Sequence, residues 1–154
     1  MKKIVIIGAG ISGLYLANLL QRTQKYEYLI CEKRSNFDLN DSYGIQLSVN
    51  SIKLLNDIGF KNIPIHDVFF PKNVNFFDAN TNKNLCSIDI SKFNFGNNFY
   101  TTLKRSTLVK FLLDNIPLDK IINSCEPKNI DYSENIKVSF SNNLTKEFDY
   151  LVVS

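Results

Sequence analysis

The fold is decided by the stretch KIVIIGAGISGL, residues 3–14. Its apolar run, Ile4 to Ile7, predicts a buried parallel strand, and the glycine-rich turn after it leads into the apolar spacing of a helix. Glu32 closes the next apolar run, at about Glu27 to Glu32, nineteen residues after Gly13. A glycine turn between strand and helix, followed by an acidic residue roughly 20 positions later, is typical of a βαβ unit that binds a dinucleotide.

Each glycine of the turn has its own physical role in this interpretation. Gly8 permits the sharp turn, Gly10 leaves room for phosphate groups, and Gly13 lets the helix lie close to the sheet. Free N–H groups at the helix start and the positive end of the helix dipole would hold a pyrophosphate. Glu32 would accept hydrogen bonds from adenosine ribose hydroxyls. The alternative, a glycine-rich turn without a ligand, leaves the spacing to Glu32 as a coincidence.

Length and composition indicate one globular domain. The chain has 154 residues, 44% hydrophobic and 12% aromatic, and a net charge of +3. Acidic and basic residues are interspersed, so we expect no nucleic-acid partner. No apolar run approaches the roughly 20 residues of a membrane span. Glycines interrupt the N-terminal apolar run, which favours a strand over a secretory signal.

The cysteines and the histidine suggest no catalytic or metal site. Cys31, Cys86 and Cys125 lack metal-ligand spacing, which favours reduced thiols and a cytoplasmic location over a disulfide framework or a zinc site. His66 has no nucleophile-elbow sequence nearby, so we expect a surface loop histidine and not a member of a catalytic triad.

Further along the chain, periodicity predicts alternating strands and helices around one hairpin. In the first half we expect a helix ending near Lys25, a loop from Ser35 to Tyr43, a strand from Gly44 to Ser48, and a helix capped by Asn50 or Ser51 and ended by Gly59. A hairpin of Asn75 to Asp78 with Leu85 to Ile90 should follow, and then a helix from Ser106 or Thr107 through Asn115. The last predicted elements are strands at Ile121 to Cys125, Ile136 to Phe140 and Phe148 to Val153. Seven phenylalanines between positions 69 and 99 are expected in a core or a domain interface, ahead of an aromatic pocket.

Four stretches, taken in order, carry a resemblance to a known family. The first is Gly8 to Leu14 with Glu32 to Arg34, and the second is Gly44 to Phe60, which looks like a Gly-Ile-x-Leu-Ser-Pro-Asn segment and its Leu-Gly helix end. The third, Lys104 to Leu108, looks like an Arg-x-x-Leu helix start. The fourth, Phe148 to Val153, looks like the opening of an Asp-x-Leu-Val-Gly-Ala-Asp-Gly strand. This set resembles the FAD-dependent aromatic hydroxylases, the class A flavoprotein monooxygenases of salicylate-hydroxylase-like type. The resemblance implies an α/β fold: a Rossmann-like FAD-binding βαβ domain with an inserted β-hairpin.

The sequence also departs from that family. Val49 stands where proline is common, and Ser42 and Tyr43 stand where small residues are usual. The Ala-Asp-Gly ending, the later Gly-Asp motif and the substrate-binding sheet are missing. Residues 1–154 would therefore be the N-terminal part of an FAD-binding domain, less than half of such an enzyme.

The resemblance implies roles for particular residues. The expected cofactor-binding residues are Gly8, Gly10, Ile11, Ser12 and Gly13 at the FAD pyrophosphate, Glu32 at the adenosine ribose, Lys33 or Arg34 at the adenine side, Gly44 near the flavin, and Arg105 at the phosphate or ribityl region. For Lys33, Arg34 and Arg105 a plain solvated charge remains the alternative.

The implied activity is hydroxylation of an aromatic or similar small organic substrate, with FAD as cofactor and NAD(P)H as reductant. The flavin carries that chemistry, so we name no catalytic residue. We expect the fragment alone to be inactive. Two alternatives stay open: a truncated, inactive nucleotide-binding fragment, and a plain NAD(P)-binding domain, against which Arg105 and the hairpin argue. Substrate, oligomeric state and the choice of NADH or NADPH are not fixed by the sequence.

Overall fold

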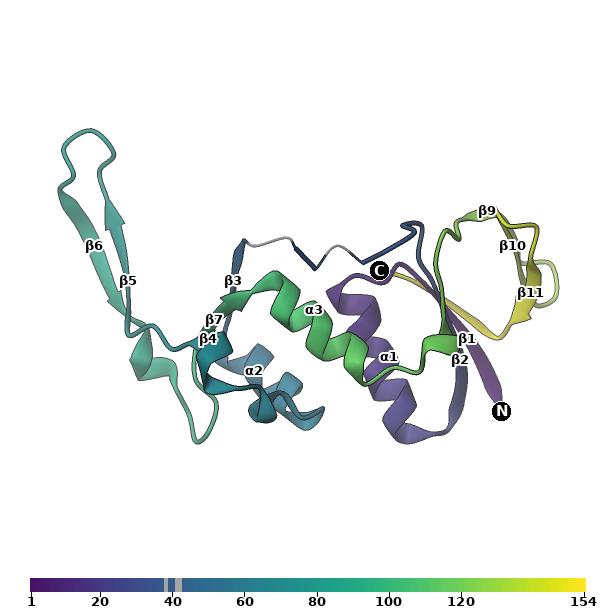
Figure 1. Cartoon of the computed structure of the whole chain (residues 1–154), viewed down its shortest axis with the longest axis horizontal. Helices are drawn as coiled ribbons and strands as arrows, with labels where there is room; N and C mark the ends of the chain where they lie inside the picture. Colours follow the sequence, from purple (N-terminus) through teal and green to yellow (C-terminus); the bar gives the residue numbers. More distant parts are fainter. Residues whose placement is uncertain (38, 41–42) are drawn as a thin grey trace. The chain divides into compact units, whose positions relative to one another are not determined.

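The computed structural model describes residues 1–37, 39–40 and 43–154 (Figure 1). Ser42, noted above ahead of Gly44, lies outside the described residues. The chain is of mixed α/β type, as predicted, and divides into two compact units. The first comprises Met1–Asn40 with Leu108–Ser154, and the second comprises Asp41–Thr107.

A four-stranded parallel sheet organises the first unit. Its strand order is β12-β1-β2-β8, with bounds β12 Tyr150–Val153, β1 Lys2–Ile7, β2 Tyr26–Cys31 and β8 Ile121–Ile122. Helix α1, Ile11–Thr23, connects β1 to β2. In register, Ile6 lies between Ile30 and Val152. The predicted βαβ unit is therefore present.

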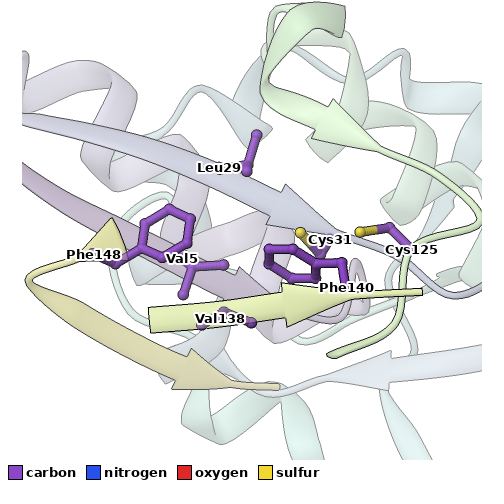
Figure 2. Packing of buried hydrophobic residues seen from close by; sticks show 7 residues of the cluster. All are labelled: Val5, Leu29, Cys31, Cys125, Val138, Phe140 and Phe148. Carbon is purple, nitrogen blue, oxygen red and sulfur yellow. The ribbon is translucent and has the colours of Figure 1, made fainter. Parts of the chain in front are cut away.

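An antiparallel sheet, ordered β11-β10-β9, packs against one face of this parallel sheet. Its strands are β9 Pro127–Asp131, β10 Ile136–Phe140 and β11 Thr145–Phe148. Side chains alternate across β10, so Val138 and Phe140 point inward. Figure 2 shows the core between the two sheets, formed by Val5, Leu29, Cys31, Cys125, Val138, Phe140 and Phe148. Full burial of one such large apolar side chain stabilises the fold by about 1.5–3 kcal/mol.

Two strand predictions in this unit need correction. Phe148 to Val153 is not one strand, because the chain reverses at Asp149: Phe148 ends β11 and Tyr150 begins β12. The Asp149 carboxylate holds this reversal by accepting hydrogen bonds from Lys2 Nζ at 2.6 Å and from Lys3 N at 2.7 Å. The strand predicted from Ile121 to Cys125 is only the two residues of β8, and Ser124 beyond it has a positive φ of 52°.

The second unit holds a small antiparallel sheet, a helix and a hairpin. The sheet order is β3-β7-β4, with bounds β3 Gly44–Leu47, β7 Thr101–Lys104 and β4 Val68–Phe69. Helix α2 is Val49–Asp57, and the hairpin strands are β5 Asn73–Phe77 and β6 Asn84–Asp89. Helix α3, Arg105–Asp114, follows β7 directly and continues into the first unit.

Details of the second unit confirm some predictions and correct others. The hairpin is present, and Gly59 follows the end of α2 with a φ of +101°. The N-cap of α2 is Ser48, not Asn50 or Ser51. The seven phenylalanines are not core residues, because their exposed fractions run from 41% to 79%; they are Phe69, Phe70, Phe76, Phe77, Phe93, Phe95 and Phe99.

Within the described part of the chain, none of the helices combines the length and apolarity needed to cross a bilayer.

Candidate functional site

The glycine turn after β1 is packed so tightly that two of its positions exclude any side chain. Gly8 has a φ of +105°, and its N–H donates to Cys31 O at 2.8 Å. A Cβ on Gly8 would collide with Ser154 O, and a Cβ on Gly13 would collide with Gly8 O and lie 2.5 Å from Ser154 Oγ. Gly13 therefore allows the close helix packing predicted for it, and Gly8 allows the turn.

Gly10 differs from its two neighbours. It is the N-cap of α1 with φ −71° and ψ −179°, an extended conformation open to any residue. A Cβ built there meets no atom within 4 Å. Neither backbone strain nor protein packing requires glycine at this position, and a side chain would fill only the space in front of the helix. That space is where the βαβ interpretation places the pyrophosphate.

The start of α1 is chemically suited to an anion. It has no side-chain cap and no acidic residue in its first turn. The first N–H groups of an α-helix lack intrahelical partners, and the helix dipole is positive at this end. Ser12 is exposed and Ile11 partly exposed. The residues predicted to face a pyrophosphate are therefore together at one helix end.

Glu32 lies directly after β2 and beside the glycine turn. Its Oε2 accepts a hydrogen bond from Ala9 N at 2.8 Å, and its Oε1 accepts one from Arg34 N at 2.9 Å. Its backbone also pairs with the segment after β8, because Glu32 N donates to Ile122 O and Cys125 N donates to Glu32 O, both at 2.9 Å. A carboxylate has about four acceptor positions, so both oxygens can still accept from a ribose.

Lys33 and Arg34 follow Glu32 and are exposed. Arg34 O accepts a hydrogen bond from Ser124 N at 3.1 Å, which fixes its backbone. In the part of the chain that the structure describes, neither side chain takes part in an ion pair. Their charged ends can therefore turn toward a ligand or toward solvent.

Gly44 and Arg105 come together in the second unit. Gly44 is paired with Lys104 across β3 and β7, and Arg105 N donates to Tyr43 O at 3.1 Å. The Arg105 guanidinium lies 5.9 Å from the centre of the Tyr43 ring, a cation–π contact. Gly44 is exposed, and a Cβ there would meet no atom within 4 Å. The predicted site residues thus form two groups, one in each unit.

Two buried thiols lie next to the Glu32 group. Cys31 and Cys125 are each 1% exposed, and their side chains interact with each other (Figure 2). Burial raises the pKa of the Cys31 thiol far above its ordinary value, and it raises the pKa of Cys125 as well. Both are therefore neutral packing groups at neutral pH.

Sequence reasoning missed three residues of these groups. Ala9 contributes a backbone N–H, Ser154 packs on the glycine turn and donates from Oγ to Gly8 O at 2.9 Å, and Tyr43 stacks with Arg105. A backbone donor leaves no trace in side-chain identity. The aromatic residue ahead of Gly44 was visible as a departure from the family pattern, but its partner was not.

Comparison with known proteins supports a nucleotide-binding fold. A family model described as an NAD(P)-binding Rossmann-like domain matches residues 6–37. No curated protein matches the sequence. Among solved structures, 2,6-dihydroxypyridine-3-hydroxylase from Arthrobacter nicotinovorans is 16% identical with a TM-score of 0.76, covering 97% of this chain and 36% of its own. HpxO from Klebsiella pneumoniae, complexed with FAD and uric acid, is 18% identical with a TM-score of 0.77, covering 97% of this chain and 38% of its own.

The chain shares the fold of one part of these hydroxylase structures. A third structure agrees: the tetrameric form of 2-methyl-3-hydroxypyridine-5-carboxylic acid oxygenase is 18% identical, with a TM-score of 0.76 over 98% of this chain and 38% of its own. The resemblance inferred from four short stretches is confirmed at the level of the fold. The chain spans well under half the length of each of these proteins.

Proposed function

We propose that residues 1–154 are the FAD-binding portion of a flavoprotein monooxygenase that hydroxylates an aromatic or similar small organic substrate, with NAD(P)H as reductant. The observation that carries the proposal is Gly10, a glycine that neither packing nor backbone geometry requires, at the start of an uncapped helix. The fold shared with a protein whose structure holds FAD and uric acid supports the choice of cofactor and of substrate class.

In this proposal the two groups of residues divide the work of binding. The N–H groups around Gly10, Ile11 and Ser12 hold the pyrophosphate, and Glu32 accepts from the ribose. Lys33 or Arg34 contacts the adenine side. Arg105 adds a charge-assisted hydrogen bond at the phosphate or ribityl region, close to Gly44 beside the flavin. When bound, the flavin supplies the redox chemistry, and the chain binds and orients it.

Titration of the purified chain with FAD tests the cofactor assignment. The chain contains no tryptophan, so quenching of flavin fluorescence and the visible flavin spectrum are free of indole signals. We expect saturable but weak binding, because the chain covers only 36–39% of the length of the hydroxylase structures and the rest of such a protein would add contacts to the ribityl and isoalloxazine parts. No uptake of FAD together with measurable binding of NAD⁺ or NADP⁺ contradicts the proposal.

The second candidate is a plain NAD(P)-binding domain, favoured by the family model over residues 6–37. It predicts that the chain binds NAD⁺ or NADP⁺ in preference to FAD in the same titration. A truncated fragment without turnover also binds FAD without oxidising NAD(P)H, as we expect for residues 1–154 alone under the leading proposal. The two differ in whether the coding sequence beyond Ser154 continues into an Ala-Asp-Gly ending and a Gly-Asp motif. The cytoplasmic location and the absence of a nucleic-acid partner stay predictions.

A further inference from the structure

The Glu32 side chain joins two backbone segments, the glycine turn and the loop after β2. One oxygen accepts from Ala9 N, inside the glycine turn, and the other accepts from Arg34 N, in the loop after β2. The two contacts are short, at 2.8 and 2.9 Å, and both are charge-assisted, which makes them stronger than bonds between neutral groups.

The glycine turn needs such a restraint. Ala9 lies between Gly8 and Gly10, and glycine has more backbone freedom than any other residue. Neighbouring bonds hold the two ends of the turn: Gly8 N donates to Cys31 O at 2.8 Å, and Leu14 N donates to Gly10 O at 2.9 Å. The bond from Ala9 N to Glu32 acts between these two anchors, where the N–H groups that face the ligand are oriented.

We propose that Glu32 is a positioning residue that latches the glycine turn to the loop after β2 and so keeps the anion site formed before any ligand arrives. This role is separate from acceptance of hydrogen bonds from a ribose. Its effect on ligand affinity rests on the proposed function, but its effect on the ligand-free chain does not.

Electrostatics makes the two roles distinguishable. A carboxylate close to a pyrophosphate repels it, so removal of a carboxylate that contacts only the ribose leaves binding of a ribose-free anion unchanged or makes it tighter. Removal of a residue that positions the turn weakens binding of the same anion. The N–H groups then lose their preset orientation, and the anion must order them on binding. Inorganic pyrophosphate is therefore the informative probe.

The first arm of the test measures amide hydrogen exchange in the ligand-free chain by NMR. Glu32→Ala is expected to speed exchange at Ala9 and Arg34 by about tenfold, the change for a lost bond of about 1.4 kcal/mol. Glu32→Gln keeps one amide oxygen as acceptor and is expected to give a smaller increase. Glu27→Gln, an exposed glutamate at the other end of β2, is the matched control and should change neither amide. Unchanged exchange at Ala9 in folded Glu32→Ala overturns the proposal.

The second arm titrates inorganic pyrophosphate and follows the amide signals of Gly8, Gly10 and Gly13. We expect Glu32→Ala to bind pyrophosphate several-fold more weakly than the wild-type chain. Equal or tighter binding contradicts the positioning role of Glu32. If Glu32→Ala does not fold, the exchange measurement and the pyrophosphate titration are both made on Glu32→Gln instead. A wild-type chain that binds neither pyrophosphate nor FAD refutes the proposed function, and the exchange arm still decides the latch.

Discussion

At Gly13 an added methyl group would collide with Gly8 O and approach Ser154 Oγ to 2.5 Å and Ile6 Cγ2 to 3.2 Å. Alanine normally stabilises a helix interior relative to glycine by up to about 1 kcal/mol. Here the steric conflict involves backbone, so the overpacking cost prevails. We predict that Gly13→Ala lowers the free energy of unfolding by about 1–3 kcal/mol, measured by urea denaturation. An equal or higher unfolding midpoint contradicts this packing account.

The three cysteine thiols are expected to differ in their reactivity toward thiol reagents. Cys86 is exposed, whereas Cys31 and Cys125 are buried with raised pKa values. Thiolate is the reactive form, so burial suppresses reaction twice, through access and through ionisation. With an aromatic disulfide reagent at pH 8, we predict one fast thiol in the native chain and two more after unfolding. Cys86→Ser should abolish the fast phase, and a fast phase that survives this substitution contradicts the assigned burial.

At the scale of elements, the reversal between β11 and β12 depends on Asp149. The hydrogen bond from the Lys2 side chain, followed by the one from Lys3 N, lowers the pKa of Asp149 below its ordinary value of 3.8. A carboxyl group whose pKa is lower in the folded state stabilises the fold at pH values above its pKa in the unfolded chain. This stabilisation is lost as the pH falls through the pKa of the folded state.

Asp149→Asn should therefore lower the melting temperature at neutral pH and flatten its decline below about pH 4. Thermal unfolding followed by circular dichroism from pH 7 to pH 2 measures both effects. Lys2→Met is the matched control, because it removes the principal cause of the shift while the carboxyl stays. An acid profile of Asp149→Asn identical to that of the wild-type chain is incompatible with this role.

The same elements show what local sequence can and cannot predict. The βαβ unit was predictable because apolar runs and glycine spacing are local signals. The reversal at Asp149 was not, because apolar, β-prone residues continue on both sides and the partner, Lys2, is 147 positions away. Strand β9, with the sequence PKNID, has no clear apolar alternation and depends on pairing with β10.

The candidate site divides in a similar way. Spacing alone predicted Gly8, Gly10, Gly13 and Glu32, which the structure brings together in the first unit. The proximity of Gly44 to Arg105 depends on pairing of β3 with β7, two strands that are more than fifty residues apart. The cap of α2 was misplaced because Ser48, Asn50 and Ser51 are all plausible caps, and their side chains hydrogen-bond to one another and not to the helix N–H groups.

At the scale of the whole molecule, the chain has the fold of part of a larger type of protein. It covers 36–39% of the matched hydroxylase-type structures. The second unit exposes seven phenylalanines, of which Phe70 and Phe99 contact each other with ring centroids 5.5 Å apart. Under the proposed function, this partial coverage is the reason to expect weak binding of FAD by residues 1–154.

The central claim is that the turn from Gly8 to Gly13 holds the pyrophosphate of FAD, and Gly10→Ala tests it most directly. The added methyl group meets no protein atom within 4 Å, and alanine at an N-cap costs only about 0.5–1 kcal/mol relative to glycine, so the variant should fold. We predict near-normal urea denaturation together with FAD affinity at least about tenfold weaker in a fluorescence titration, a loss of about 1.4 kcal/mol. A folded Gly10→Ala that binds FAD as tightly as the wild-type chain would contradict the claim.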